Sequence, residues 1–196
     1  MTTPPVPPGA ALLLIDVQQG FDDPVWGPRN NPDAELVAAA LLAAWREHGW
    51  PVVHVQHDAV EPGSPLEPGQ PGHAHKPEVA PLPVEPVVHK TVNSAFIGTD
   101  LQERLTALQV PGLVVAGLTT DHCVSTSVRM AGNLGFETWL VADACAAHDR
   151  VGADGQRYAA QLVHEVALAS LHEEFATVVE SGALLAALPD GPVRPR

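Results

Sequence analysis

The chain has 196 residues with a hydrophobic share of 45%, which suits one domain with a well-buried core. Asp and Glu number 23 against 10 Lys and Arg, and the formal charge of −13 opposes sequence-independent binding to nucleic acid or to an anionic membrane. The two cysteines, Cys123 and Cys145, lack zinc-finger or disulfide-framework spacing, and no apolar run approaches the ~18 residues that span a bilayer.

The first ten residues lack the basic cluster and the apolar stretch of a signal peptide. We therefore expect a cytoplasmic protein, because a reducing compartment keeps a working thiol free. The expected organisation is a single domain, residues 1–196, with flexible tails at 1–9 and 190–196.

Short apolar runs alternate with helical patterns along the chain. Near-continuous Val, Leu and Ile runs are typical of strands that are buried on both faces. We expect six strands, at Ala11–Ile15, Val52–Val55, Val87–His89, Leu113–Ala116, Thr138–Ala142 and Ala176–Val179.

A well-delimited helix is predicted between the first two strands. Asn31 is a plausible N-cap, Pro32 fits the first helical position, and Gly49 can end the helix in a left-handed turn. Its apolar residues recur at helical spacing and are expected to pack on the sheet: Leu36, Val37, Leu41, Ala44 and Trp45.

The segment 57–86 supports neither helical nor strand periodicity, because it contains eight prolines and three glycines. A loop of this length inside one domain is unusual. Since it follows the carboxyl end of a strand, it is either a rim or lid over a site or an ordered proline-rich crossing of the surface.

Four more helices are predicted farther along the chain. A pattern resembling a capping box, Thr99 with Gln102, precedes the first of them. The others are expected from about Cys123 to Leu134, from near Asp154 to about Glu173, and over Ala183–Leu188. Strands alternating with helices predict an α/β fold, a three-layer doubly wound arrangement with a six-stranded parallel sheet.

Three reactive side chains follow strands of this sheet. Asp16 ends the first strand, Lys90 ends the third, and Cys123 begins a helix after the fourth. Each has an ordinary explanation as a cap, a solvated lysine or a packing thiol. Ligands in open parallel sheets bind outside the carboxyl ends of the strands, so all three on one edge indicate a catalytic site.

Three ordered motifs resemble the isochorismatase-like cysteine hydrolase superfamily, which includes nicotinamidases, N-carbamoylsarcosine amidases and isochorismatases. They are Leu-Leu-Leu-Ile-Asp16-Val-Gln-Gln-Gly-Phe21, His89-Lys90-Thr-Val-Asn-Ser-Ala-Phe96, and Val-Val-Ala-Gly117-Leu-Thr-Thr-Asp-His-Cys123-Val. Val-Ala-Asp143-Ala extends the match over most of the chain. The resemblance implies the same six-stranded fold. It also implies a homo-oligomer, either a dimer or a tetramer, and the apolar stretch Ala159–Leu171 is a candidate for the contact between subunits.

The resemblance also assigns the catalytic residues Asp16, Lys90 and Cys123. It implies a cis peptide at Leu118–Thr119 that aims the backbone N–H groups of Thr119 and Cys123 into an oxyanion hole. Chemically, we expect Cys123, acidified by the helix start and by Lys90, to attack a carbonyl carbon as a thiolate. Asp16 then takes the thiol proton and returns it to the leaving nitrogen.

Pocket walls are expected from side chains that follow the strands of Asp16 and Lys90. Aromatic rings suit a flat or apolar acyl group, although Phe96 is also a plausible core residue. The expected substrate-binding residues are Gln18, Phe21, Trp26, Asn93 and Phe96, and His148 is a weaker candidate. No histidine stands at an obvious position for a Cys–His dyad.

No metal or other cofactor is expected. Nicotinamidases of this superfamily bind a divalent metal through an Asp-x-His pair after the second strand, and that spacing is absent from His54-Val-Gln-His57-Asp58. A site built from His57, Asp58, His73 or His75 is chemically feasible, but a solvated loop is the preferred interpretation.

The sequence therefore predicts a hydrolase that cleaves a C–N bond, amide or ureido, of a small molecule through a thioester. The alternatives are an isochorismatase-type vinyl-ether hydrolase, a nicotinamidase, and a non-catalytic binding or scaffold protein. A dinucleotide-binding enzyme is disfavoured, because no G-x-G-x-x-G follows the first strand.

Overall fold

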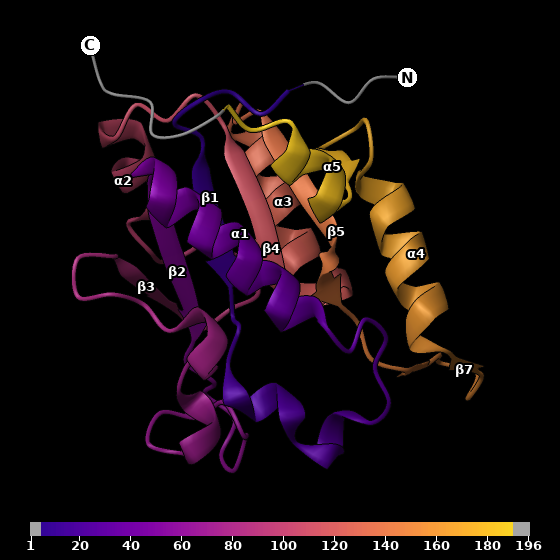
Figure 1. The fold of residues 1–196 in the computed structure, drawn as a ribbon. Coiled ribbons are helices and arrows are strands. Elements are labelled where there is room, and N and C mark those ends of the chain that lie inside the picture. The colour runs from indigo at the N-terminus through magenta and orange to yellow at the C-terminus, as the bar shows by residue number, and fades with distance from the viewer. Residues whose placement is uncertain (1–4, 190–196) are drawn as a thin grey trace.

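Six parallel strands form one sheet in the computed structural model, which describes residues 5–189. The strands are β1 (Ala11–Ile15), β2 (Val52–His57), β3 (Val87–Lys90), β4 (Leu113–Leu118), β5 (Thr138–Ala146) and β8 (Thr177–Val179). Their order is β3-β2-β1-β4-β5-β8, so the chain begins in the middle of the sheet and extends to both sides (Figure 1). The predicted doubly wound α/β fold is confirmed.

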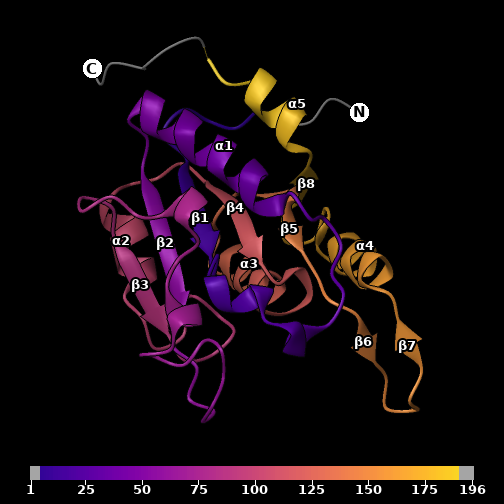
Figure 2. The same cartoon turned by 60° about the horizontal axis from the view of Figure 1, so that its bottom comes forward.

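Helices cover both faces of the sheet. The helices are α1 (Ala34–His48), α2 (Leu101–Ala107), α3 (Ser125–Asn133), α4 (Ala160–Leu171) and α5 (Ser181–Ala186). Helices α1 and α5 pack on one face, and α2, α3 and α4 pack on the other (Figure 2). Alternate residues of the central strands enter the two hydrophobic cores, which explains why the strands read as continuous apolar runs.

Tryptophan side chains fill the core beneath α1. Trp45 is fully buried, its indole N–H donates to the carbonyl of Ala10 at 2.8 Å, and its ring meets Trp50 edge to face at 5.4 Å. Val6 is buried in the same cluster, within the segment predicted as an N-terminal tail. Residues 1–4 and 190–196 of the predicted tails lie outside the described residues.

The prediction for the start of α1 is wrong by two residues. Asp33 is the N-cap, and Gly49 ends the helix in the left-handed conformation as expected. Asn31 instead has a φ of 43° and donates its side-chain amide to the carbonyl of Cys145 at 2.7 Å. The side chain of Asn31 therefore bonds the distant strand β5 and does not cap the helix.

The starts of α3, α4 and α5 also differ from the prediction, and α5 begins at Ser181, two residues before the predicted Ala183. The segment at Cys123 is a single π-helical turn, Thr120–Val124, and α3 follows it. Helix α4 begins after Asp154, because Asp154 and Gly155 form the turn between the short strands β6 (Arg150–Val151) and β7 (Arg157–Tyr158). The predicted capping box is also absent, since Asp100 is the N-cap of α2 without a side-chain cap bond.

Residues 57–86 form an ordered segment at the carboxyl edge of the sheet. It contains two short 3-10 helices, Pro71–His73 and Pro77–Val79, and it buries Leu66. Glycine is required where this segment meets the loop after β1, since a Cβ on Gly72 would lie 2.7 Å from the Cα of Gly20. The segment is therefore packed against the loop that follows Asp16.

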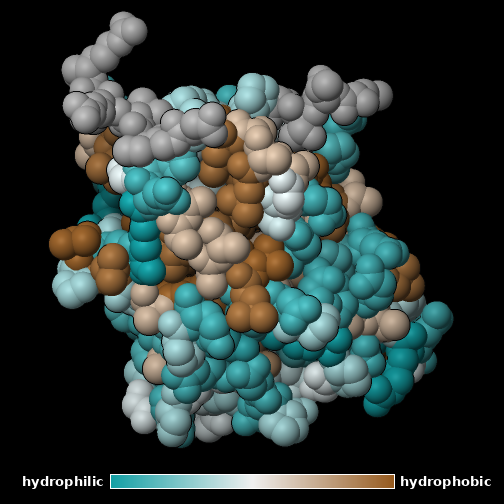
Figure 3. Space-filling model, in the orientation of Figure 1, coloured by the Kyte–Doolittle hydropathy of each residue, from teal (hydrophilic) through white to brown (hydrophobic). Residues whose placement is uncertain are grey.

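Several helix faces expose apolar side chains. Leu36 of α1 is exposed, and Figure 3 shows apolar surface over α1 and α5. On α4, Leu162 and Val166 are exposed as well. Oligomerisation through α4 stays a prediction. Across residues 5–189, no helix is both long and apolar enough to span a membrane.

Gly117 in β4 pairs with Ile15 in β1 and leaves no room for a side chain. Its φ is 137°, and a Cβ at this position would clash with the carbonyl oxygen of Ile15 in the paired strand β1. The backbone itself is the obstacle, so no rotamer change relieves the clash.

We predict that Gly117→Ala lowers the free energy of unfolding by about 3 kcal/mol or more, because it combines overpacking with an unfavourable φ. Urea denaturation followed by circular dichroism measures this loss. Gly98→Ala is the matched control, since Gly98 also has a positive φ but has open space around it, and about 1 kcal/mol is expected. Equal losses in the two variants would contradict the packing argument.

Candidate active site

The structure brings Asp16, Lys90 and Cys123 together at the carboxyl edge of the sheet. The ammonium nitrogen of Lys90 lies 2.6 Å from Asp16 Oδ2 and 3.4 Å from Cys123 Sγ. All three residues are buried. Residues far apart in the sequence thus form one compact cluster, as the strand order requires.

Asp16 directly follows β1 and adopts a φ of 51°. Aspartate tolerates this left-handed conformation better than most residues. The carboxylate is completely buried, so a solvated role for Asp16 is excluded. Neither carboxylate oxygen accepts a hydrogen bond from a backbone N–H group of residues 5–189, so Asp16 does not cap a helix.

Cys123 lies in the π-helical turn that follows β4. The peptide bond Leu118–Thr119 is cis, as the family resemblance implied. The carbonyl of Thr119 accepts hydrogen bonds from the backbone N–H groups of His122 and Val124, at 3.1 and 3.2 Å. These bonds hold the turn in a form that points the sulfur of Cys123 toward Lys90.

Lys90 is the centre of the cluster. Besides Asp16 and Cys123, its ammonium nitrogen lies 3.0 Å from Nδ1 of His57. His57 ends β2 and is in register with Lys90 on β3, so the two side chains start side by side. An ammonium group has three N–H donors, and three acceptors surround it here.

Burial sets the proton affinities of these groups. It raises the pKa of Asp16 to about 6, although the nearby Lys90 ammonium acts in the opposite direction. Burial, and then the negative charge of Asp16, raise the pKa of the Cys123 thiol. The expected acidification of Cys123 is therefore wrong, because Lys90 offsets only part of the cost of desolvation, and the resting group is a thiol.

A small pocket of about 100 Å³ opens beside the sulfur of Cys123. Phe21 and Trp26 form one wall, with ring centroids 5.5 Å apart, and Leu66 from the proline-rich segment contributes another. The indole N–H of Trp26 donates to the carbonyl of Gly20 at 2.8 Å, which fixes the ring. The remaining lining residues are His57, Asn93, Thr119, His122 and Arg150.

The predicted pocket residues divide into two groups. Phe21, Trp26 and Asn93 line the pocket, and Asn93 Oδ1 lies 3.6 Å from the sulfur of Cys123. Gln18 does not line it: its side-chain amide bonds the backbone of His57 and His73.

Phe96 and His148 also lie outside the pocket lining. Phe96 is buried in the core cluster that contains α2 and α3. Its ring stacks on Phe136 at 6.1 Å, which agrees with its alternative reading as a core residue. His148 packs behind Phe21 and Trp26, with Nδ1 3.2 Å from the carbonyl of Gly27.

Arg150 is a pocket residue that sequence reasoning missed. It lies in β6, and its guanidinium binds both carboxylate oxygens of Asp121 at 2.7 and 3.1 Å. The same group lies 3.5 Å from Thr119 Oγ1. The sequence analysis left Arg150 in an unassigned connection before a helix predicted from near Asp154, and the hairpin that positions it was not foreseen.

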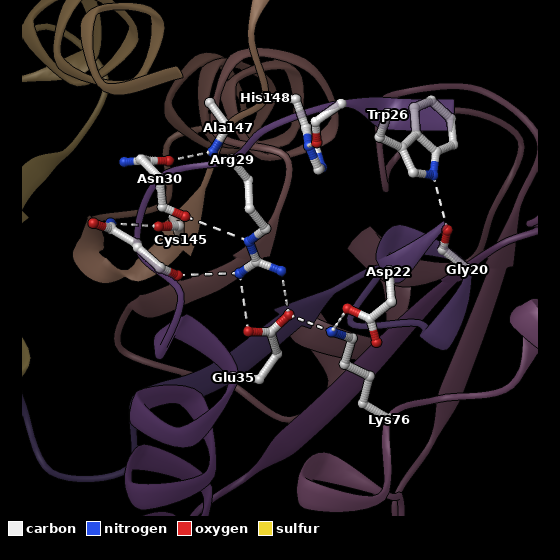
Figure 4. A network of polar contacts seen from close by, with 12 residues as sticks. Gly20, Asp22, Trp26, Arg29, Asn30, Glu35, Lys76, Cys145, Ala147 and His148 are labelled. Atoms are coloured by element: carbon white, nitrogen blue, oxygen red, sulfur yellow. Dashed lines mark hydrogen bonds and ion pairs between the residues drawn. The ribbon is translucent and has the colours of Figure 1, made fainter. Parts of the chain in front are cut away.

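An ion-pair network centred on the buried Glu35 joins three segments of the chain (Figure 4). Glu35 of α1 accepts hydrogen bonds from Arg29 and from Lys76, which also binds Asp22. Burial alone would raise the pKa of Glu35, but these hydrogen bonds outweigh it and lower the pKa. The network joins α1 to the proline-rich segment and to the loop after β1, which also carries Phe21 and Trp26.

The histidines and the acid considered as metal ligands do not converge. Asp58 bonds His73 at 2.7 Å and His89 at 3.1 Å, whereas His57 faces Lys90. His75 packs against His54 instead. The donor set proposed for a metal, His57, Asp58, His73 and His75, therefore does not fit a single ion.

Three other side chains have ligand atoms close enough together to bind one metal ion. Asp16, His57 and Cys123 offer ligand atoms within 4.8 Å of one another, and no other such group of three or more occurs in residues 5–189. The ammonium of Lys90 already contacts all three side chains. A cation placed among them would face a buried positive charge, so this trio does not fit a metal while Lys90 is present.

The chain matches the family model described as Isochorismatase domain over residues 10–182. A solved structure from Chromobacterium violaceum, assigned to the same family, is 49% identical, with a TM-score of 0.92 over 95% of this chain and 97% of that one. The family protein YrdC of Bacillus subtilis is 46% identical over 89% of this chain and 94% of its own length. Streptothricin hydrolase of Streptomyces noursei is 38% identical over 79% of this chain and 61% of its own length.

Proposed function

Because the chain belongs to the isochorismatase family of hydrolases, we propose that it is a cysteine hydrolase that cleaves an amide or ureido C–N bond of a small molecule. The observation that carries the proposal is the contact of one buried ammonium, that of Lys90, with both the carboxylate of Asp16 and the sulfur of Cys123. A nucleophile, a base and a cation are thereby within reach of one small pocket.

In the first step Asp16 accepts the proton of the Cys123 thiol while the sulfur attacks the carbonyl carbon. The C–S bond forms and the carbonyl electron pair moves to oxygen. The backbone N–H groups of Thr119 and Cys123 are the proposed donors to this oxyanion, in the turn that the cis peptide begins.

In the second step the proton held by Asp16 passes to the leaving nitrogen. The C–N bond breaks, ammonia or an amine departs, and a thioester remains on Cys123. Asp16 then takes a proton from water, whose oxygen attacks the thioester, and the thiol is restored as the carboxylic acid leaves. A carboxyl with a pKa of about 6 suits both roles, because it accepts and donates a proton near neutral pH.

Lys90 makes this cycle possible by its charge. Its ammonium keeps the pKa of the buried Asp16 lower than burial alone would, so Asp16 is a carboxylate at neutral pH. It also stabilises the thiolate as that charge develops on sulfur. Both effects are strong because the group is shielded from water.

The thiol beside Asp16 favours acyl transfer over vinyl-ether hydrolysis, which needs only proton donation. The charges around the pocket are also paired, Arg150 with Asp121 and Lys90 with Asp16. A polyanionic substrate would find no unpaired cation there, whereas a small amide needs none. The buried Asp16–Lys90 pair also argues against a scaffold role. Such a pair is costly to desolvate, and a scaffold does not need it.

We predict that Cys123→Ala abolishes turnover of any amide that the protein hydrolyses, and that Asp16→Asn lowers kcat by about 10²- to 10⁴-fold through loss of the base. The substrate is sought by exposing the protein to a panel of small amides and ureido compounds, nicotinamide first, and detecting an acyl adduct on Cys123 by mass spectrometry. Cys145→Ala is the control, since Cys145 is fully buried away from the pocket lining. Native turnover by Cys123→Ala would contradict the mechanism.

The pH dependence follows from Asp16. The carboxylate form is the base, so kcat/KM is expected to rise with pH up to about 6 and to fall about tenfold per unit below it. The profile is measured as initial rates between about pH 4 and 8 on an amide that the protein hydrolyses. An activity that persists undiminished well below pH 5 would show that Asp16 is not the base.

We further propose that the reaction needs no metal. Dialysis against a strong chelator is expected to leave kcat and KM unchanged, because the candidate ligands do not converge on one point. Metal content by plasma mass spectrometry, before and after dialysis, serves as the control. Loss of activity that is restored by one divalent ion would refute this part of the proposal.

A further inference from the structure

His57 is a polar pocket residue that the proposed mechanism does not use. It ends β2, lines the pocket beside Cys123, and places Nδ1 3.0 Å from the ammonium of Lys90. One of its ring nitrogens is among the ligand atoms that lie within 4.8 Å of those of Asp16 and Cys123. The imidazole is therefore close to the place where the scissile bond must lie.

The contact with Lys90 decides which nitrogen carries the proton. An ammonium group is only a donor, so Nδ1 must accept, and a neutral imidazole with an unprotonated Nδ1 carries its hydrogen on Nε2. Within residues 5–189, no hydrogen bond to Nε2 of His57 is found, although Nδ1 has its partner. The N–H group therefore has no partner among the described residues, and it belongs to a side chain that lines the pocket.

Two other polar groups at the pocket already face partners. The guanidinium of Arg150 is held by Asp121, and Oδ1 of Asn93 faces the sulfur of Cys123. Phe21, Trp26 and Leu66 offer apolar surface. A pocket of about 100 Å³ leaves a small acyl group little freedom to turn away from His57.

We propose that His57 is a specificity-determining residue, which presents Nε2–H to the pocket and selects acyl groups with a hydrogen-bond acceptor one or two atoms from the scissile carbonyl. A purely aliphatic acyl group would leave this donor unpaired when water is displaced, and a cationic one would face both this N–H and Lys90. The inference rests on the proposed acyl chemistry at Cys123.

The first arm of the test needs no substrate. Long-range proton–nitrogen NMR spectra of protein labelled at its histidines distinguish the two neutral tautomers, and the missing signal in His57→Asn assigns the residue. Nδ1 is expected to be unprotonated and Nε2 protonated at pH 7. A proton on Nδ1 would overturn the proposal, whatever Cys123 does.

The second arm measures selectivity with aldehydes, which imitate the amide carbonyl. The sulfur of Cys123 adds to the aldehyde carbon and the thiol proton ends on its oxygen, so binding protects Cys123 from iodoacetamide, as mass spectrometry measures. Methoxyacetaldehyde and butanal have equal numbers of heavy atoms and differ by one ether oxygen in place of a methylene.

Two variants separate the roles of the ring nitrogens. In His57→Asn the amide oxygen can accept from Lys90 but no donor reaches the pocket, whereas in His57→Gln the amide N–H reaches toward the position of Nε2. The ratio of the affinities for methoxyacetaldehyde and butanal is expected to be at least roughly fivefold higher in the native protein than in His57→Asn. That factor corresponds to the loss of about one hydrogen bond. His57→Gln is expected to retain part of it.

The comparison with His57→Asn cancels the unequal reactivity of the two aldehydes. A merely structural role for His57 would change the binding of both aldehydes equally, and an unchanged preference in His57→Asn would overturn the inference. Protection by neither aldehyde in the native protein would instead contradict the acyl chemistry at Cys123, and this inference with it.

Discussion

A buried ammonium group dominates the energetics of this site. Lys90 is removed from water and is tolerated because acceptors from three other segments surround its nitrogen: Asp16, His57 and Cys123. Removing a charge from water costs several kcal/mol unless hydrogen bonds and an opposite charge replace the solvent. The pKa of Asp16, the protonated resting state of Cys123 and the orientation of His57 all depend on this arrangement.

The sheet supplies that arrangement with few specialised residues. Parallel strands end at one edge, and the order β3-β2-β1-β4 places Lys90, His57, Asp16 and the Cys123 turn on four successive strands. Each side chain needs only to be the last residue of its strand or to lie in the turn that follows. The outer loops then close the pocket, and they determine its shape rather than its chemistry.

The sequence was informative where local pattern decides the structure. Apolar runs located all six strands, and counting them placed Asp16, Lys90 and Cys123 on one edge. The sequence was less informative where contacts between distant residues determine the structure. Asn31 was taken for a cap because its strand partner is remote, and Phe96 followed the right strand but enters the core. The raised pKa of Cys123 also depends on burial, which a helix-start argument does not contain.

The ion pairs of Glu35 tie two loops together. Glu35 binds both Arg29 and Lys76, which come from two loops with independent sequences, and Lys76 also binds Asp22. Replacing Glu35 by an apolar residue would leave Arg29 without its carboxylate partner and Lys76 with Asp22 alone, so the contact between the two loops depends on this one side chain. Trp26 and Leu66 line the pocket outside this network, and exchanging them would change the shape of the pocket while leaving those ion pairs in place.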